Sequence, residues 1–83
     1  MKTSNWKRID NDNSQEITLA NGRKFKVCKQ YDVNMNTQDI KHKGQWQVHE
    51  WDIYSKEWEF LDNFSPMWYA KQQAIELGSY DGI

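Results

Sequence analysis

Hydrophobic and polar residues alternate around a short polar loop near the start of the chain, and this pattern predicts a β-hairpin. Ile17 and Leu19 alternate with polar residues before the loop 20–22, and Phe25 and Val27 resume the alternation after it. The loop ends in a glycine, which is suited to the positive φ that a three-residue hairpin connection requires. Pairing Ile17 with Phe25 puts the apolar side chains on one face. We expect this hairpin to contribute to the core.

The alternation of the second strand continues to Met35, and a polar stretch follows. Residues 36–44 contain one apolar residue and end at Gly44. This composition predicts an exposed loop. Before the first hairpin, residues 1–14 are interpreted either as a flexible N-terminus or as a short edge strand over 6–9 followed by a polar turn.

A second hairpin is predicted over residues 46–64, with its turn near Ser55 and Lys56. The expected cross-strand pairs are Ile53 with Trp58 and Trp51 with Phe60. These four large side chains would form a cluster that stabilises the sheet and faces the core. The other face would carry carboxylates, from Glu50, Asp52, Glu57 and Glu59.

Trp46 and Val48 are out of phase with Trp51 and Ile53 in this second hairpin. Side chains alternate between the two faces of a strand, so all four cannot face the core in a regular strand. The phase change predicts either a β-bulge near His49 or an apolar patch on the uncovered face of the sheet.

A helix is predicted at the C-terminal end. Ser65-Pro66 is typical of a helix start, and Gly78 stands where a left-handed residue commonly ends one. The expected apolar stripe consists of Met67, Ala70, Ala74, Ile75, Leu77 and, at its margin, Trp68. The predicted fold is α+β: one domain over 1–83, with a four-stranded antiparallel sheet, or a five-stranded one if the N-terminal edge strand forms. The single C-terminal helix packs on one face.

Composition restricts the class of protein. Twelve of the 83 residues are aromatic, the net charge is −1, and Cys28 is the single cysteine, so no intramolecular disulfide can form. No apolar run is long enough to span a membrane, and no signal peptide is apparent. We therefore expect a cytoplasmic protein that does not associate with membranes.

The sequence offers no recognisable catalytic or metal site. Asp52 and Glu59 could act as a carboxylate pair, but acidic residues on a solvent-exposed strand face are common, and acid–base chemistry needs a pocket that excludes water. Cys28, His42 and His49 lack the spacing of metal-binding motifs. We expect no enzyme activity, no catalytic residues, no cofactor and no metal.

Basic residues around the first hairpin suggest a nucleic-acid interface. Residues 1–30 hold seven Lys and Arg against three Asp and Glu, whereas residues 31–83 hold four against nine. The candidate contacts are Arg23, Lys24, Lys26 and Lys29. In the predicted register Phe25 lies on the opposite face from Lys24 and Lys26, so rings and cations would not act together. Nucleic-acid binding is therefore the alternative hypothesis.

The number of aromatic residues exceeds what a one-helix core can bury, so some rings should be exposed. Trp and Tyr are enriched at binding hot spots, and an aromatic patch beside acidic strands favours protein recognition. The leading hypothesis is a non-enzymatic protein-binding domain, specifically an inhibitor, encoded by a phage or mobile element, of a host defence system or host enzyme that acts by covering its target. The candidate partner-binding residues are Trp46, Glu50, Asp52, Tyr54, Glu57, Glu59 and Tyr69. Homodimerisation through an exposed edge strand is a further hypothesis.

Overall fold

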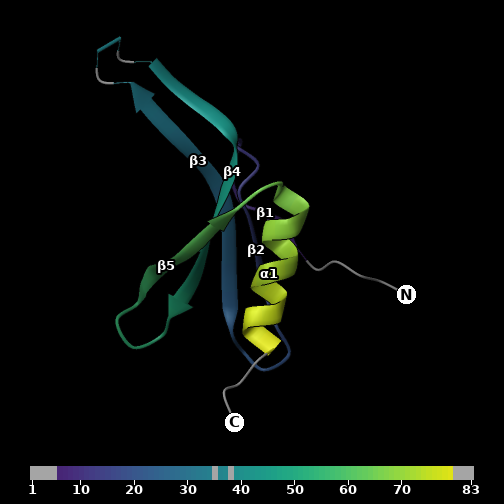
Figure 1. Cartoon of the computed structure of the whole chain (residues 1–83). Coiled ribbons are helices and arrows are strands. Elements are labelled where there is room, and N and C mark those ends of the chain that lie inside the picture. Colours follow the sequence, from purple (N-terminus) through teal and green to yellow (C-terminus); the bar gives the residue numbers. More distant parts are fainter. Residues whose placement is uncertain (1–5, 35, 38, 80–83) are drawn as a thin grey trace.

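The computed structural model describes residues 6–34, 36–37 and 39–79. Five strands form one antiparallel sheet in the order β1-β2-β3-β4-β5, and one helix follows them. The elements are β1 (Lys7–Arg8), β2 (Gln15–Thr18), β3 (Lys24–Asn34), β4 (Asp39–Asp52), β5 (Glu57–Phe64) and α1 (Met67–Ser79). Figure 1 shows α1 lying along one face of the sheet, where it contacts β3, β4 and β5. The predicted α+β fold, with the additional N-terminal edge strand, is confirmed.

The first hairpin forms in the predicted register. Ile17 pairs with Phe25, Gly22 has a φ of 92°, and the Leu19 N–H donates to the Arg23 carbonyl at 2.8 Å. Upstream, the Asp10 carboxylate accepts hydrogen bonds from the backbone N–H groups of residues 12 and 14. These bonds close the turn between β1 and β2. They also hold the pKa of Asp10 below its usual value, chiefly through the bond from Ser14.

The expected loop over 36–44 is wrong for most of its length. β4 begins at Asp39 and pairs with β3 as far as Asn34, so the two strands form a long ribbon that projects beyond the helix in Figure 1. A two-stranded ribbon that no helix covers does not require alternating apolar residues. A polar sequence can therefore form a strand here, although its composition is typical of a loop. Met35, the last residue of the expected alternation, lies outside the described residues.

The turn of the second hairpin includes Ser55 and Lys56, as predicted, but the strand before it ends earlier than expected. β4 ends at Asp52, whose carboxylate accepts from the N–H groups of Tyr54 and Ser55, while its carbonyl accepts from the Lys56 N–H at 2.7 Å. Trp51 therefore pairs with Trp58, and Phe60 pairs with His49. The expected pairs of Ile53 with Trp58 and of Trp51 with Phe60 are wrong because Ile53 belongs to the turn.

The face assigned to the second hairpin is also reversed. Val48 pairs with Val27, and both are fully buried with Phe25 beneath α1. Strand alternation then puts Trp51 on the uncovered face of the sheet. The register of β4 with β5 shifts between Val48 and His49, with Leu61 as the extra residue in β5. The bulge expected near His49 is therefore present, but it interrupts β5 and leaves the alternation of β4 intact.

The core lies between the sheet and α1. Its buried apolar residues are Ile17, Phe25, Val27, Trp46, Val48, Ala70 and Ala74. Met67 and Ile75 pack against this cluster, as the predicted helix stripe requires. Trp68 and Leu77, which were also assigned to the stripe, are exposed. The inward face of α1 instead continues to Gly78, which is buried.

Gly78 lies within α1, so its predicted role as a terminal residue beyond the helix is wrong. The helix carbonyls at this end are bound by side chains of the β2–β3 hairpin: Asn21 Nδ2 donates to the Gly78 carbonyl at 2.8 Å, and Arg23 Nη1 donates to the Leu77 carbonyl at 3.1 Å. These bonds satisfy acceptors that the helix itself leaves open. Gly78 is needed for a close approach, because an added Cβ would lie 2.3 Å from Leu19 Cδ1 and 2.6 Å from Phe25 Cε2.

Substituting Gly78→Ala should therefore destabilise the protein. Alanine favours a helix over glycine by about 1 kcal/mol, but overpacking against the buried Phe25 ring typically costs about 1–3 kcal/mol. We expect a net loss in the free energy of unfolding, measured by urea titration. Ser79→Ala, at an exposed position one residue later, is the control and should change little. A Gly78→Ala variant as stable as the parent would contradict the close contact.

Candidate functional site

The thiol and the imidazole on the uncovered face lie close together around Gln47. Cys28 Sγ lies 3.9 Å from Gln47 Oε1, and His49 Nε2 lies 2.9 Å from the same oxygen. Burial raises the pKa of Cys28, while burial and the nearby Lys26 lower the pKa of His49. Both groups are therefore neutral at pH 7. A neutral thiol bonded to an amide oxygen is not an activated nucleophile.

In the part of the chain that the structure describes, no group of three or more His, Cys, Asp or Glu residues is arranged to hold a metal ion. None of its helices combines the length and apolar character needed to cross a membrane.

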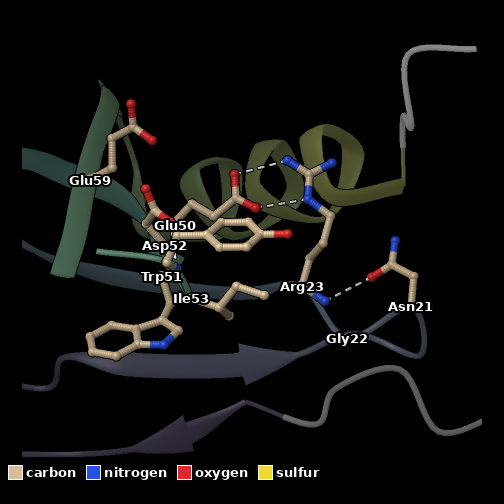
Figure 2. A pocket seen from close by; sticks show the side chains of 9 residues that line it. Asn21, Gly22, Arg23, Glu50, Trp51, Asp52, Ile53 and Glu59 are labelled. Atoms are coloured by element: carbon tan, nitrogen blue, oxygen red, sulfur yellow. Dashed lines mark hydrogen bonds and ion pairs between the residues drawn. The ribbon is translucent and has the colours of Figure 1, made fainter. Parts of the chain in front are cut away.

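A pocket of about 430 Å³ opens at the end of the β4–β5 hairpin, beside the C-terminal end of α1 (Figure 2). Its walls come from the β2–β3 loop, the end of β4, the turn that follows and β5. The lining residues are Asn21, Gly22, Arg23, Glu50, Trp51, Asp52, Ile53, Tyr54 and Glu59. We call this region the hairpin-end pocket.

An ion pair forms one wall of the hairpin-end pocket. Arg23 Nε and Nη2 each donate to the Glu50 carboxylate at 2.8 Å, as the dashed lines in Figure 2 show. This two-pronged geometry is the strongest arrangement available to an arginine and a carboxylate. The hydrogen bonds to Glu50 raise the pKa of Arg23. Because Arg23 neutralises Glu50, the pocket lining has a net negative charge from Asp52 and Glu59.

The rim of the hairpin-end pocket exposes two large side chains. Ile53 is 63% exposed and Tyr54 is 90% exposed. The turn that carries them is held at its base by the three hydrogen bonds to Asp52. An anchored turn therefore presents an aliphatic and an aromatic side chain next to carboxylates.

The predicted partner-binding residues divide into two groups. Four of them line the hairpin-end pocket: Glu50, Asp52, Tyr54 and Glu59. Glu57 is exposed and lies opposite Asp52 in the strand register of β4 and β5. Trp46 and Tyr69 lie elsewhere. Trp46 is only 7% exposed and belongs to the core, so its expected exposure is wrong. Tyr69 lies in the first turn of α1, where its ring packs against Phe64 and Trp68 with centroid distances of 5.7 and 5.8 Å.

The candidate nucleic-acid residues also divide. Arg23 pairs with Glu50 in the pocket wall, and Lys29 Nζ lies 3.5 Å from Asp12. Lys24 and Lys26 remain on the uncovered face, where Lys26 Nζ lies 4.6 Å above the centre of the Trp58 ring. Phe25 lies on the opposite face from these lysines, as predicted, but the Trp58 ring, which was assigned to the core, lies with them.

Sequence reasoning missed Asn21, Arg23 and Ile53 as parts of the hairpin-end pocket. Asn21 and Arg23 were assigned to a different hairpin, and the pairing of β3 with β4 brings them to the end of β4. Ile53 was assigned to the strand. The one available signal was the position of Asp52, because an aspartate commonly binds the backbone N–H two residues later and so begins a turn.

Comparisons of this chain with protein-family models, with curated proteins and with solved structures give no match.

The depressed pKa of His49 predicts that the protein loses stability in mild acid. Its Nδ1 is buried without a hydrogen-bond partner in the structure, and the folded-state pKa lies below the ordinary value of 6.5. As pH falls through 6.5, His49 in the unfolded chain binds a proton before His49 in the folded protein does. The stability that neutral His49 contributes is therefore complete above that pH and is lost as the pH falls below it. Urea unfolding at pH 7.5 and pH 5.5 measures the change.

His49→Gln is the matched variant, because glutamine is neutral at both pH values. We expect the parent to lose more stability than this variant between the two conditions. Asp10 does not affect this comparison, because its pKa is lowered from 3.8 and the stability it contributes is lost only in more acidic solutions. An equal loss in parent and variant would show that another group is responsible.

Proposed function

We propose that this chain is a non-enzymatic protein-binding domain that contacts its partner through the end of the β4–β5 hairpin. The observation that supports this proposal is the highly exposed pair Ile53 and Tyr54 at the rim of a pocket with excess carboxylates. Tyrosine is favoured at hot spots because a rigid amphipathic ring gives a large contact area and one hydrogen-bonding group. A partner of complementary chemistry offers basic side chains around an apolar contact.

Pre-organisation strengthens this proposal. The Asp52 carboxylate stabilises the turn by accepting a hydrogen bond from the Tyr54 N–H. Arg23 links the end of β4 to the last turn of α1, because it donates both to Glu50 and to the Leu77 carbonyl. A surface that is ordered before binding loses less conformational entropy when the partner arrives. The hairpin end is therefore suited to tight contact despite its small size.

The size of the chain is compatible with an inhibitor that acts by covering its target. A standard protein interface buries about 800 Å² on each partner. The described structure has a total accessible surface of 6152 Å², so one such interface would occupy a modest share of it. The rest of the domain would then act as a steric block beside the docking site. The proposed target is a host defence system or host enzyme.

A homodimer through the outer edge of β5 is less favourable. An added antiparallel copy of β5 would bring further carboxylates next to Glu57, Glu59 and Asp62, and β5 contains no lysine or arginine. Like charges on neighbouring strands repel. The bulge at Leu61 also interrupts a regular pairing edge.

The double variant Tyr54→Ala/Glu59→Lys tests the proposed interface. Loss of a hot-spot ring and reversal of one charge should raise the dissociation constant at least tenfold, because a single hot-spot truncation costs about 2 kcal/mol or more. The partner is first captured from a lysate of the native cells with nuclease present. Its affinity for the purified variants is then measured by calorimetry.

Trp68→Ala/Glu76→Lys is the matched control, since it also removes one exposed ring and reverses one charge, but on the outer face of α1. This control should bind with the parental affinity. If the control loses binding and the hairpin variant does not, the interface lies on the helix and the proposed docking site is wrong.

A further inference from the structure

The two sides of the sheet carry opposite charge around the β4–β5 hairpin. Strand alternation puts Glu50 and Glu59, which pair with each other, on the side of α1. The uncovered face carries Lys24 and Lys26 on β3 together with rings from β4 and β5. These rings belong to His49, Trp51, Trp58 and Phe60, which form two cross-strand pairs.

Lysines and rings are in direct contact on this uncovered face. Lys26 Nζ lies 4.6 Å from the centre of the Trp58 ring, and Lys24 Nζ lies 6.0 and 5.9 Å from the centres of the Trp51 and Trp58 rings. The two indoles meet edge to face, with centroids 5.3 Å apart. Phe60 is 51% exposed and packs edge to face with His49 at 5.5 Å. The ammonium groups therefore lie over the indole pair, and the half-exposed Phe60 ring lies on the same face.

From this arrangement we propose that the uncovered sheet face binds single-stranded nucleic acid, with phosphates over the β3 lysines and bases against the rings of β4 and β5. Lys24 and Lys26 are two residues apart on one strand, which spaces their Cα atoms by about 7 Å along the direction of β3. A strand of nucleic acid lying parallel to β3 meets both ammonium groups in succession. Its bases then turn toward Phe60 and the indole pair.

Single strands suit this surface better than duplexes. Stacking on exposed rings requires unpaired bases, whereas duplex binding depends mainly on a larger array of phosphate contacts. The described contacts of the patch also include a carboxylate, since Lys24 Nζ lies 3.9 Å from Glu16. Glu16 reduces the local positive charge, so the rings must contribute a substantial part of the affinity and binding must be sensitive to salt.

Fluorescence anisotropy with labelled 12-nucleotide oligo-dT and oligo-U tests the proposal on the whole chain. We expect saturable binding at low salt, with log K falling as log salt rises by about 0.7 for each phosphate contacted. Binding of either oligomer supports the proposal, and a preference for one shows that the face responds to the 2′-hydroxyl or to the thymine methyl group. The absence of binding to both at 50 mM salt would overturn it.

Three variants locate the binding surface. Lys24→Gln/Lys26→Gln should weaken binding at least tenfold and flatten the salt dependence. Phe60→Ala, at a half-exposed ring whose loss the core tolerates, should weaken binding without changing that dependence. The control Lys29→Gln/Lys56→Gln removes the same charge outside the patch and should bind like the parent.

The outcome is independent of the proposed protein interface. The variant Tyr54→Ala/Glu59→Lys should retain oligonucleotide binding, because its residues lie on the turn and on the other face. If Lys24→Gln/Lys26→Gln abolishes capture of a protein partner while the parent binds no oligonucleotide, the uncovered face is a protein surface. That result would reject the nucleic-acid proposal.

Discussion

The pairing of β3 with β4 decides which side chains of the sheet meet the helix. Val27 and Val48 are opposite each other and fully buried, and Phe25 completes this centre two residues along β3. Because these three residues face α1, strand alternation places Lys26, His49 and Trp51 on the opposite side of the sheet. Their position on the uncovered face follows from the pairing in the core. Both candidate binding surfaces depend on this register.

The contact between Gly78 and Phe25 brings the end of α1 close to the loop that forms one wall of the hairpin-end pocket. At this separation Asn21 and Arg23 reach the last carbonyls of the helix, and Arg23 also reaches Glu50. One hairpin loop thus closes the helix end and builds a wall of the pocket. A displacement of α1 would disturb helix termination and pocket shape together, since both use the same guanidinium group.

The sequence was informative where local chemistry decides the structure. The Asn-Gly loop, the pairing of Ile17 with Phe25 and the approximate extent of α1 could all be predicted, because each depends on residues close in the chain. The faces of the second hairpin could not. The periodicity of Trp51, Trp58 and Phe60 correctly indicates that they share a face, but it cannot say which face. That information lies in the pairing of Val48 with Val27, 21 positions away.

The same ambiguity explains why only part of each candidate site could be predicted. Four acidic or aromatic residues of the hairpin end were identified because they lie close together in the chain, whereas Asn21 and Arg23 reach the pocket through the pairing of β3 with β4. Nucleic-acid binding was ranked second because Phe25 lies on the opposite face from Lys24 and Lys26, and the rings that do lie with these lysines, Trp51 and Trp58, were assigned to the core. Burying Trp46 there instead releases these indoles to lie beneath Lys24 and Lys26. A choice between two apolar sets thus determines whether cations and rings can act on one ligand.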